Sequence, residues 1–383
     1  MSLMLPAPPA HARSLTEVMP RLWASVGGPE PDFGVQQLPP VASAIAVVVD
    51  GLGAANLAAR AGHARFLREA MAKRDTALSV FPSTTASALT SLMTGAAPGR
   101  HGIVGYRVRV PGTAVLSNQL TGWEKDGLDP ATWQRAETLF ERASRRGHAC
   151  FVVSREDYRS SGFTRAAFRG SHFLAAGSFA DRLTLALETA RAHPGSLTYV
   201  YTPDLDALGH RIGWESDAWV AALEQVDAAA REFSRDAAAL GIGAVLTADH
   251  GMVDVPRDGH VLVVEGDAIL DGVAALAGEP RMLHVYAEPG EAEQVAHRWR
   301  ASEESRSWVL SRAEAISAGI LGSVDPEVMP RLGDVLVAAR ARVAYYDDRL
   351  PDKGPQNMVG QHGSLTLDER LVPLIRLGAY ATR

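Results

Sequence analysis

The stretch Val80-Phe-Pro-Ser-Thr-Thr-Ala-Ser-Ala-Leu-Thr-Ser-Leu-Met-Thr-Gly95 places two adjacent threonine hydroxyls between a short apolar segment and a run of helical spacing. Pro82 disfavours helical backbone in the residue before it, so the chain must turn there. Small and apolar residues recur at helical spacing from Thr85 onward, and Gly95 supplies a stop. Thr84 and Thr85 are therefore expected near a helix N-terminus, where unpaired N–H groups favour anions. Taken alone, the pattern also fits a threonine that only caps the helix.

Apolar runs alternate with helical patterns on both sides of this stretch. Residues 44–50 are apolar up to a final aspartate, which is typical of a central parallel strand buried on both faces. The order of strand and helix predicts an α/β fold, with a doubly wound, mostly parallel sheet flanked by helices. Further strands are expected at 76–81, 149–153, 197–201, 244–248 and 371–377, a hairpin in 102–120, and helices at 55–73, 133–146, 179–192 and 216–239.

Changes in composition along the chain predict three parts. Residues 1–40 are rich in proline and glycine around one amphipathic segment, and we expect an arm or lid rather than a piece of the core. Residues 41–260 together with 356–383 are expected to form the main core. Residues 261–355 have short apolar runs and one helical pattern, and are expected to form a smaller inserted or capping subdomain.

The composition restricts the class of protein. The chain has 383 residues, 46% of them hydrophobic, and no apolar run approaches the roughly 18–20 residues that cross a bilayer, so no membrane partner is expected. A net charge of −6 argues against a nucleic-acid polymer as partner. The single cysteine, Cys150, lies in an apolar run and is expected to be buried strand filler. The N-terminus has no signal-peptide pattern, which predicts a cytoplasmic protein.

Acidic and histidine residues follow three of the predicted parallel strands. Asp50 ends the first, Asp206 and His210 follow the 197–201 strand, and Asp249 and His250 follow the 244–248 strand. Ligands bind beyond the carboxyl ends of such strands, so we expect these side chains to meet. The first aspartate–histidine pair is four residues apart and shares one helical face, although a capping aspartate beside a solvated histidine fits equally well. Adjacent side chains at a strand end diverge, which suits two neighbouring ions better than one.

His362 lies between Gly360 and Gly363, on a backbone free to bend toward a ligand, although a loop histidine without function is the simpler interpretation. With the five residues above it makes six nitrogen and oxygen ligands, to which Thr85 adds a hydroxyl. This set suits two divalent ions of the zinc type, each with an open position, while manganese or iron would also fit. A cysteine-based zinc site is excluded because Cys150 is the only cysteine.

The sequence resembles the alkaline phosphatase superfamily, nearest its nucleotide pyrophosphatase/phosphodiesterase branch, and thus an alkaline-phosphatase-like metal-hydrolase core. The matching segments occur in family order and span most of the chain: Val49-Asp-Gly51, Phe81-Pro-Ser-Thr-Thr85, Thr94-Gly95, Pro98-Gly-Arg-His-Gly-Ile103, Asp206 to His210 with Gly213, Asp249-His-Gly-Met252 and Gly360-Gln-His-Gly363. The resemblance implies that Thr85 is the nucleophile and forms a phosphothreonine intermediate. It further implies two zinc ions, one held by Asp206, His210 and His362, the other by Asp50, Asp249, His250 and Thr85.

Two departures from the family pattern bear on the substrate. Nucleotide-cleaving members carry an aromatic residue after the nucleophile and an asparagine soon after the His-Gly-Ile block, whereas this chain has Ala86 and Gly105-Tyr106 there. Tyr106 or Asn118 is a candidate to contact substrate in place of that asparagine. The expected activity is cleavage of phosphodiester or pyrophosphate bonds in a small phosphorylated substrate. A phosphomonoesterase or a phosphonate (C–P) hydrolase is the nearest alternative.

Other classes fit the sequence less well. A sulfatase would need a C/S-x-P-x-R block, which does not occur, and a metal-dependent phosphoglycerate mutase would place a serine where Thr85 stands. Gly51-Leu-Gly53 could be a fragment of a dinucleotide-binding module, but Asn56 occupies the place of the third glycine. A nucleotide-binding protein that has lost catalysis is remote, because all seven expected metal and nucleophile positions are filled.

Overall fold

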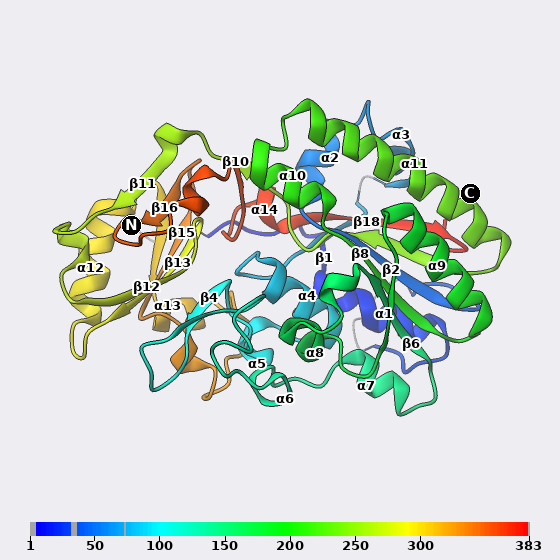
Figure 1. Cartoon of the computed structure of the whole chain (residues 1–383), viewed down its shortest axis with the longest axis horizontal. Helices are drawn as coiled ribbons and strands as arrows, with labels where there is room; N and C mark the ends of the chain where they lie inside the picture. Colours follow the sequence, from blue (N-terminus) through cyan, green and yellow to red (C-terminus); the bar gives the residue numbers. More distant parts are fainter. Residues whose placement is uncertain (1–4, 32–36, 73, 382–383) are drawn as a thin grey trace.

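Strand β2 lies inside an eight-stranded sheet, and all six of its residues are buried (Figure 1). The structure is a computed structural model that describes residues 5–31, 37–72 and 74–381. Neighbouring strands are parallel except at β18, which is antiparallel to both β3 and β9. The strands, in spatial order, are β1 (Arg13–Ser14), β3 (Thr76–Leu78), β18 (Leu371–Gly378), β9 (Gly243–Thr247), β2 (Ala44–Val49), β8 (Leu197–Thr202), β6 (Cys150–Ser154) and β7 (His172–Ala175).

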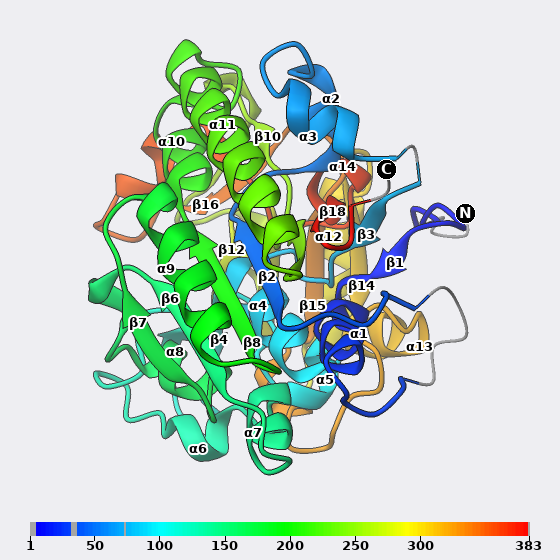
Figure 2. The same cartoon turned by 90° about the vertical axis from the view of Figure 1, so that its right-hand side faces the viewer.

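Helices cover both faces of this sheet, which confirms the predicted fold class (Figure 2). One face carries α2 (Ala54–Ala59), α3 (Arg65–Ala70), α9 (Phe179–Ala192) and α11 (Asp217–Ala239). The other carries α1 (Val18–Ser25), α4 (Thr85–Thr94), α7 (Leu139–Ser144) and α8 (Gly162–Ala167). Shorter helices in the connections are α5 (Pro98–His101), α6 (Pro130–Trp133), α10 (Asp204–Ile212) and α14 (Leu367–Arg370).

Helix α4 begins at Thr85 and ends at Thr94, as predicted, and all ten of its residues are buried. Gly95 terminates it with a φ of +69°, a left-handed conformation that favours glycine. Its small side chains allow close approach to α1, α7 and α8, which surround it. The predicted hairpin is also present, as β4 (Arg107–Arg109) paired with β5 (Leu116–Asn118). Cys150 is a buried free thiol in β6, as predicted.

Two predicted helices are wrong in extent because each is interrupted. The 55–73 pattern is split into α2 and α3 around Gly62, and the start of α3 is capped by Asp227 of α11, which accepts hydrogen bonds from the N–H groups of Phe66 and Leu67. The 133–146 pattern is split into α6 and α7, because Thr138 and Glu141 form a capping box that starts a new helix.

The N-terminal segment is part of the core, so the expectation of an arm or lid is wrong for residues 13–25. Strand β1 pairs in parallel with β3, and Leu15, Met19 and Leu22 are fully buried in the main hydrophobic cluster. These residues repeat at helical spacing, and the apolar face they form is covered by the sheet and by α4.

Residues 260–347 contain a second sheet of four antiparallel strands, seen on the left of Figure 1. Alternate residues of β15 face different cores: Leu336 packs in the main cluster, whereas Val337 packs with Trp299 of α12 in a separate cluster. This second cluster supports the division that we propose, into 41–260 with 356–383 and an inserted 261–355. The elements are β11 (His260–Val263), β12 (Val273–Glu279), β13 (Met282–Ala287), α12 (Ala292–Glu303), β14 (Ser307–Ser311), α13 (Arg312–Ser317), β15 (Val335–Ala339) and β16 (Ala344–Asp347).

None of the helices in the described parts of the chain combines the length and apolar character needed to span a bilayer.

Candidate metal centre and nucleophile

The three central parallel strands β9, β2 and β8 deliver their carboxylates to one edge of the sheet. Asp249, Asp50 and Asp206 each follow the end of one of these strands. The loops approach so closely that a Cβ at Gly51 would lie 3.0 Å from the Asp206 Cα, and Gly51 has a φ of +73°. Glycine is therefore required at position 51, where the chain turns after β2 beside the segment that follows β8.

One group of potential ligands consists of Asp50, Asp249 and His250, all buried. Their ligand atoms lie within 4.8 Å of one another. His250 Nε2 is 3.3 Å from Asp50 Oδ1, 3.4 Å from Asp249 Oδ2 and 3.2 Å from the Thr85 hydroxyl oxygen. The expectation that Asp249 and His250 diverge toward two ions is wrong, because β9 ends at Thr247 and strand alternation no longer applies at 249–250.

A second group consists of Asp206, His210 and His362, again with ligand atoms within 4.8 Å of one another. The first two share one face of α10, and His210 Nε2 is 3.4 Å from Asp206 Oδ1. His362 arrives from the loop after β17 (Gly360–Gln361), with Nε2 3.9 Å from the same carboxylate oxygen. The His362 ring stacks on that of His250 at 3.5 Å between centroids, so the two groups adjoin.

Each of the three histidines uses Nδ1 to donate to a backbone carbonyl. The acceptors are Gly360 for His210 at 2.7 Å, Ser83 for His362 at 2.9 Å and Gly251 for His250 at 3.1 Å. A carbonyl only accepts, so Nδ1 must carry the proton, and in a neutral ring Nε2 then presents a lone pair. Burial, together with the neighbouring His250 and His210, lowers the pKa of His362 well below its usual value, which keeps that ring neutral.

The inward-facing atoms of both groups fit divalent cations. Within the described residues, Asp50 Oδ1, Asp206 Oδ1 and Asp249 Oδ2 are buried and accept no hydrogen bond. His210 and His362 bring their Nε2 lone pairs to 3.3 Å from each other, an arrangement that a cation would relieve. Burial, followed by the charges of Asp249 and Asp206, raises the pKa of Asp50 well above its usual value. Unpaired carboxylate oxygens facing imidazole lone pairs form a donor set that fits a divalent cation.

Residues 44–365 match the family model described as type I phosphodiesterase / nucleotide pyrophosphatase. The chain belongs to this family. It is therefore an enzyme, a hydrolase that acts on phosphoric esters. Members use two divalent metal ions, and the two three-residue groups are the donor sets that this chain offers for them. A sequence search of curated proteins gave no match.

Solved structures share the fold of this phosphodiesterase-family chain at low sequence identity. Murine ectonucleotide pyrophosphatase / phosphodiesterase 5 superposes with a TM-score of 0.69 at 16% identity, covering 88% of each chain. An inactive form of the same mouse protein, in complex with AMP, gives a TM-score of 0.66 at 16% identity over 88% of each chain. Phosphonoacetate hydrolase from Sinorhizobium meliloti, in complex with phosphonoformate, gives 0.67 at 20% identity, covering 90% of this chain and 92% of that one.

Thr85 is the first residue of α4 in this phosphodiesterase fold, and the N-cap position belongs to Thr84, whose side chain makes no capping hydrogen bond. The first turn of a helix leaves backbone N–H groups without intrahelical partners. Ala88 donates the first bond of this turn, to Thr84 O at 2.9 Å. The Thr85 hydroxyl therefore lies beside both the histidine and carboxylate groups and a place suited to phosphoryl oxygens.

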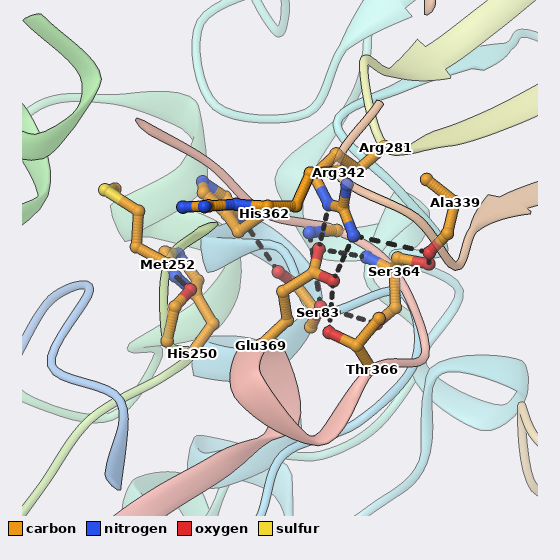
Figure 3. Close-up of polar contacts among 12 residues, drawn as sticks. Ser83, His250, Met252, Arg281, Ala339, Arg342, His362, Ser364, Thr366 and Glu369 are labelled. Atoms are coloured by element: carbon orange, nitrogen blue, oxygen red, sulfur yellow. Dashed lines mark hydrogen bonds and ion pairs between the residues drawn. The ribbon is translucent and has the colours of Figure 1, made fainter. Parts of the chain in front are cut away.

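Ser83 joins the nucleophile turn to the His362 loop (Figure 3). Its hydroxyl donates to Ser364 O at 2.8 Å and accepts from Gly363 N at 3.2 Å, and its backbone N–H donates to Gly363 O at 3.1 Å. Since its carbonyl also accepts from His362, four hydrogen bonds hold the ring against the start of α4. Sequence reasoning included Ser83 in a family motif without this role.

A buried ion pair supports the same loop from the other side (Figure 3). The guanidinium of Arg281, between β12 and β13, donates to both carboxylate oxygens of Glu369 at 2.8 Å, and both side chains are fully buried. Glu369 also accepts from Ser364 N at 3.0 Å. The pair therefore connects the second sheet to the loop that carries His362.

Tyr201 and Asn56 are further supporting residues that the sequence did not reveal. The Tyr201 hydroxyl donates to Asp50 Oδ2, leaving Oδ1 facing the centre. Asn56 bonds to both the N–H and the C=O of Met252, at 3.2 and 3.1 Å, and so fixes the turn after His250. The available signal for Tyr201 was its position two residues after Tyr199 at the end of a strand, on the same face of the sheet.

In the described part of the chain, neither Tyr106 nor Asn118 is among the residues that line the cavities at Thr85. Tyr106 lines a separate cavity, of about 120 Å³, with Arg107 and Glu279. Asn118 Oδ1 accepts from the N–H groups of Leu120 and Thr121 and so shapes its own turn. Contact of either residue with substrate stays a prediction.

Two cavities open onto Thr85. The wider, of about 620 Å³, is lined by residues of both ligand groups, including Asp50, Asp206 and His210. The second, of about 340 Å³, extends from Thr85 beneath β6 and β8 and is mostly apolar. The hydroxyl therefore has space for substrate on two sides.

Proposed function

We propose that this enzyme cleaves phosphodiester or pyrophosphate bonds of small molecules through a phosphothreonine intermediate on Thr85. One observation carries the proposal: two three-residue groups of unpaired carboxylate and imidazole atoms flank a hydroxyl at a helix N-terminus. The fold shared with murine ectonucleotide pyrophosphatase / phosphodiesterase 5 and with phosphonoacetate hydrolase supports the same class of chemistry.

The chain's own groups account for the organisation of the reaction. The Thr85 hydroxyl attacks phosphorus in line with the leaving oxygen, and the N–H groups of the first turn of α4 stabilise negative charge on the phosphoryl oxygens. Water then releases the phosphothreonine. The backbone carbonyls at Gly360, Ser83 and Gly251 hold the three imidazoles with Nε2 directed inward throughout.

Two divalent cations fit these donors, and we propose zinc. Asp206, His210 and His362 would hold one, and Asp50, Asp249, His250 and Thr85 the other. Such cations favour the ionised forms of a hydroxyl and of water and offset charge on the transferred group. A threonine hydroxyl is otherwise a poor nucleophile at neutral pH.

The decisive experiment combines metal analysis with Thr85→Ala. We expect the wild type to contain two equivalents of metal per chain and to hydrolyse bis(4-nitrophenyl) phosphate. In Thr85→Ala we expect the rate of this hydrolysis to fall by at least about a thousandfold. Acid-quenched wild type should carry phosphate on the peptide that contains Thr85. Thr84→Ala is the matched control, because the neighbouring threonine does not contact the ligand groups. An active Thr85→Ala, or a phosphorylated peptide elsewhere, would remove the threonine from its role.

A phosphomonoesterase or phosphonate hydrolase is the second candidate. Ala86 follows the nucleophile, and the phosphonoacetate hydrolase fold is as similar as the phosphodiesterase folds. A diester needs room for two organic groups, and the two cavities at Thr85 supply it. We therefore expect the nitrophenyl diester to be turned over faster than the monoester and than phosphonoacetate, and the reverse order would favour the second candidate.

A further inference from the structure

The N-cap threonine of α4 differs from most hydroxyl N-caps of this chain. Among the described residues, seven α-helices follow a serine or threonine N-cap, and in five of them the hydroxyl oxygen accepts a hydrogen bond from the third N–H of the helix. The five are Thr138, Ser161, Ser178, Ser216 and Ser311. Thr84 of α4 and Thr366 of α14 make no such bond.

A buried carboxyl group accounts for the exception at α14. The Thr366 hydroxyl donates to Glu369, whose side chain is fully buried. This side-chain hydrogen bond takes the place of the cap. The same explanation at α4 requires a buried carboxyl group beside Thr84.

Glu279, the last residue of β12, is that group. It is 6% exposed and packs against Gly363, where a Cβ would lie 2.6 Å from the Glu279 Cγ. Gly363 exchanges two hydrogen bonds with Ser83, the residue before Thr84. The Thr84 side chain interacts with the carboxyl group and partly offsets the effect of burial, which raises the pKa of Glu279 to about 8. Within the described residues, the two carboxyl oxygens have no other partner.

The first turn of α4 keeps its N–H groups without acceptors. Thr85, Ala86 and Ser87 are at least nine-tenths buried, and none of their N–H groups donates to an acceptor in the described part of the chain. Buried N–H groups are nearly always paired, so an oxygen-bearing ligand is expected to complete them. A Thr84 hydroxyl that capped α4 in the usual way would occupy the N–H of Ser87, the third residue of the helix.

We propose that Glu279 is a positioning residue of the phosphoryl site: it keeps the Thr84 hydroxyl away from α4, so that the Ser87 N–H stays open for a phosphoryl oxygen. The inference rests on the proposed function and adds to it a residue that touches neither substrate nor cation. Since Glu279 ends β12, the second sheet then contributes to the phosphoryl site without supplying a ligand.

Crystal structures of two variants test the effect of Glu279 on Thr84 without any activity. Glu279→Met keeps an unbranched side chain against Gly363 but removes the hydrogen-bonding group, and we expect the Thr84 hydroxyl to turn until it lies about 3 Å from the Ser87 nitrogen. Glu279→Gln retains a hydrogen-bonding group and should leave Thr84 as in the wild type. An unchanged Thr84 side chain in Glu279→Met would overturn the proposal.

Binding of inorganic phosphate to the metal-loaded enzyme tests the consequence. By titration calorimetry, we expect Glu279→Met to weaken phosphate binding by roughly five- to tenfold, because phosphate must displace the new cap, and Glu279→Gln to bind as the wild type does. Adding Thr84→Val to Glu279→Met should restore the affinity, because no hydroxyl is left to cap α4, and Thr84→Val alone should bind phosphate normally.

This restoration separates positioning from a general loss of structure, which a second substitution would not reverse. A weakened affinity that persists in the double variant would overturn the proposal. If Glu279→Met does not fold, Glu279→Ala removes the same carboxyl group and is compared with Thr84→Val in the same way.

Failure of the proposed function gives a different result. A wild type that binds no phosphate would overturn the proposed function and, with it, the role of the open N–H, while the crystal structures would still confirm or overturn the effect of Glu279 on Thr84. Normal phosphate binding in both the wild type and Glu279→Met would overturn this inference alone.

Discussion

At the residue scale, the chemistry depends on which atoms face the centre and on what holds them there. His210, His250 and His362 direct Nε2 inward because Nδ1 of each donates to a carbonyl. The two carboxylate oxygens of Asp50 also have different roles, since Oδ2 accepts a hydrogen bond from Tyr201 and Oδ1 is left without a hydrogen bond. These outer contacts decide whether the inner donors are aligned before any cation binds.

Tyr201→Phe tests this dependence. Burial, with the nearby carboxylate of Asp50, raises the pKa of Tyr201 well above its usual value, so its hydroxyl stays protonated and donates to Asp50. Losing that donor should weaken metal binding at the Asp50 group by roughly 10–100-fold, measured by competition with a chelator. Tyr199→Phe, two residues earlier on the same strand, should retain wild-type metal affinity because its hydroxyl does not reach Asp50. Equal affinities in the two variants would contradict the prediction.

Glu279 gives a prediction for the pH dependence of stability. Burial raises the pKa of this carboxyl from 4.5 to about 8, with a further contribution from Glu369. Between those values the folded protein keeps a proton that the unfolded chain releases, so Glu279 lowers stability as the pH rises through this window. Glu279→Gln should therefore gain stability relative to wild type between pH 5 and 8, by up to about 1.4 kcal/mol per pH unit. Urea unfolding at several pH values measures it, and a constant difference would contradict it.

At the element scale, the start of α4 and the loop after β17 must be fixed to each other, because one carries Thr85 and the other His362. Ser83 makes that connection with both its side chain and its backbone. His362 and Ser83, which share a hydrogen bond, are 279 residues apart in the sequence. No local sequence pattern could therefore encode this connection.

Ser83→Ala removes the two side-chain hydrogen bonds and leaves the backbone ones. We expect the free energy of unfolding to fall by about 1–3 kcal/mol, because Gly363 N and Ser364 O lose their partner in a buried place. Metal affinity at the His362 group should fall with it. Ser87→Ala is the control, since that hydroxyl is also buried on α4 but has no hydrogen-bond partner among the described residues. Equal losses in the two variants would argue against Ser83 as the connection.

At the scale of the whole molecule, the second sheet is attached to the main core at the same point. Arg281 comes from the turn between β12 and β13, Glu369 from α14 before the last strand of the main sheet, and both are fully buried. Arg281 also donates to the carbonyls of Ala341 and Val343. The candidate centre thus depends on how the two parts pack, although all its ligands come from the main core.

A double-mutant cycle on this ion pair tests that dependence. Arg281→Met and Glu369→Leu each leave a buried charge unpaired, and each should cost about 3–5 kcal/mol of unfolding free energy. The double variant should cost clearly less than the sum, because neither charge is then buried alone. Denaturant unfolding gives the three differences, and strict additivity would show that the pair is not coupled.

The amino-acid sequence by itself determined the elements with strong periodicity and the ends of the central strands. The apolar run at 44–49, rich in β-branched residues, is typical of a buried strand, and Asp50, Asp206 and Asp249 follow strands that are adjacent in the sheet. Carboxyl ends of parallel strands share one edge, so their convergence could be inferred without coordinates. Family motifs added His362, which lies too far along the chain for any local argument.

Only the tertiary structure decided the contacts between segments distant in sequence. Asp249 and His250 turn toward one centre because β9 ends before them, and the N-terminal segment enters the core because the sheet and α4 cover its apolar face. The Tyr201 bond to Asp50, the Ser83 connection and the cavity beneath β6 and β8 all depend on side chains that meet across the fold. Periodicity reports which face of an element is buried, whereas the partner of that face is set by packing the whole chain.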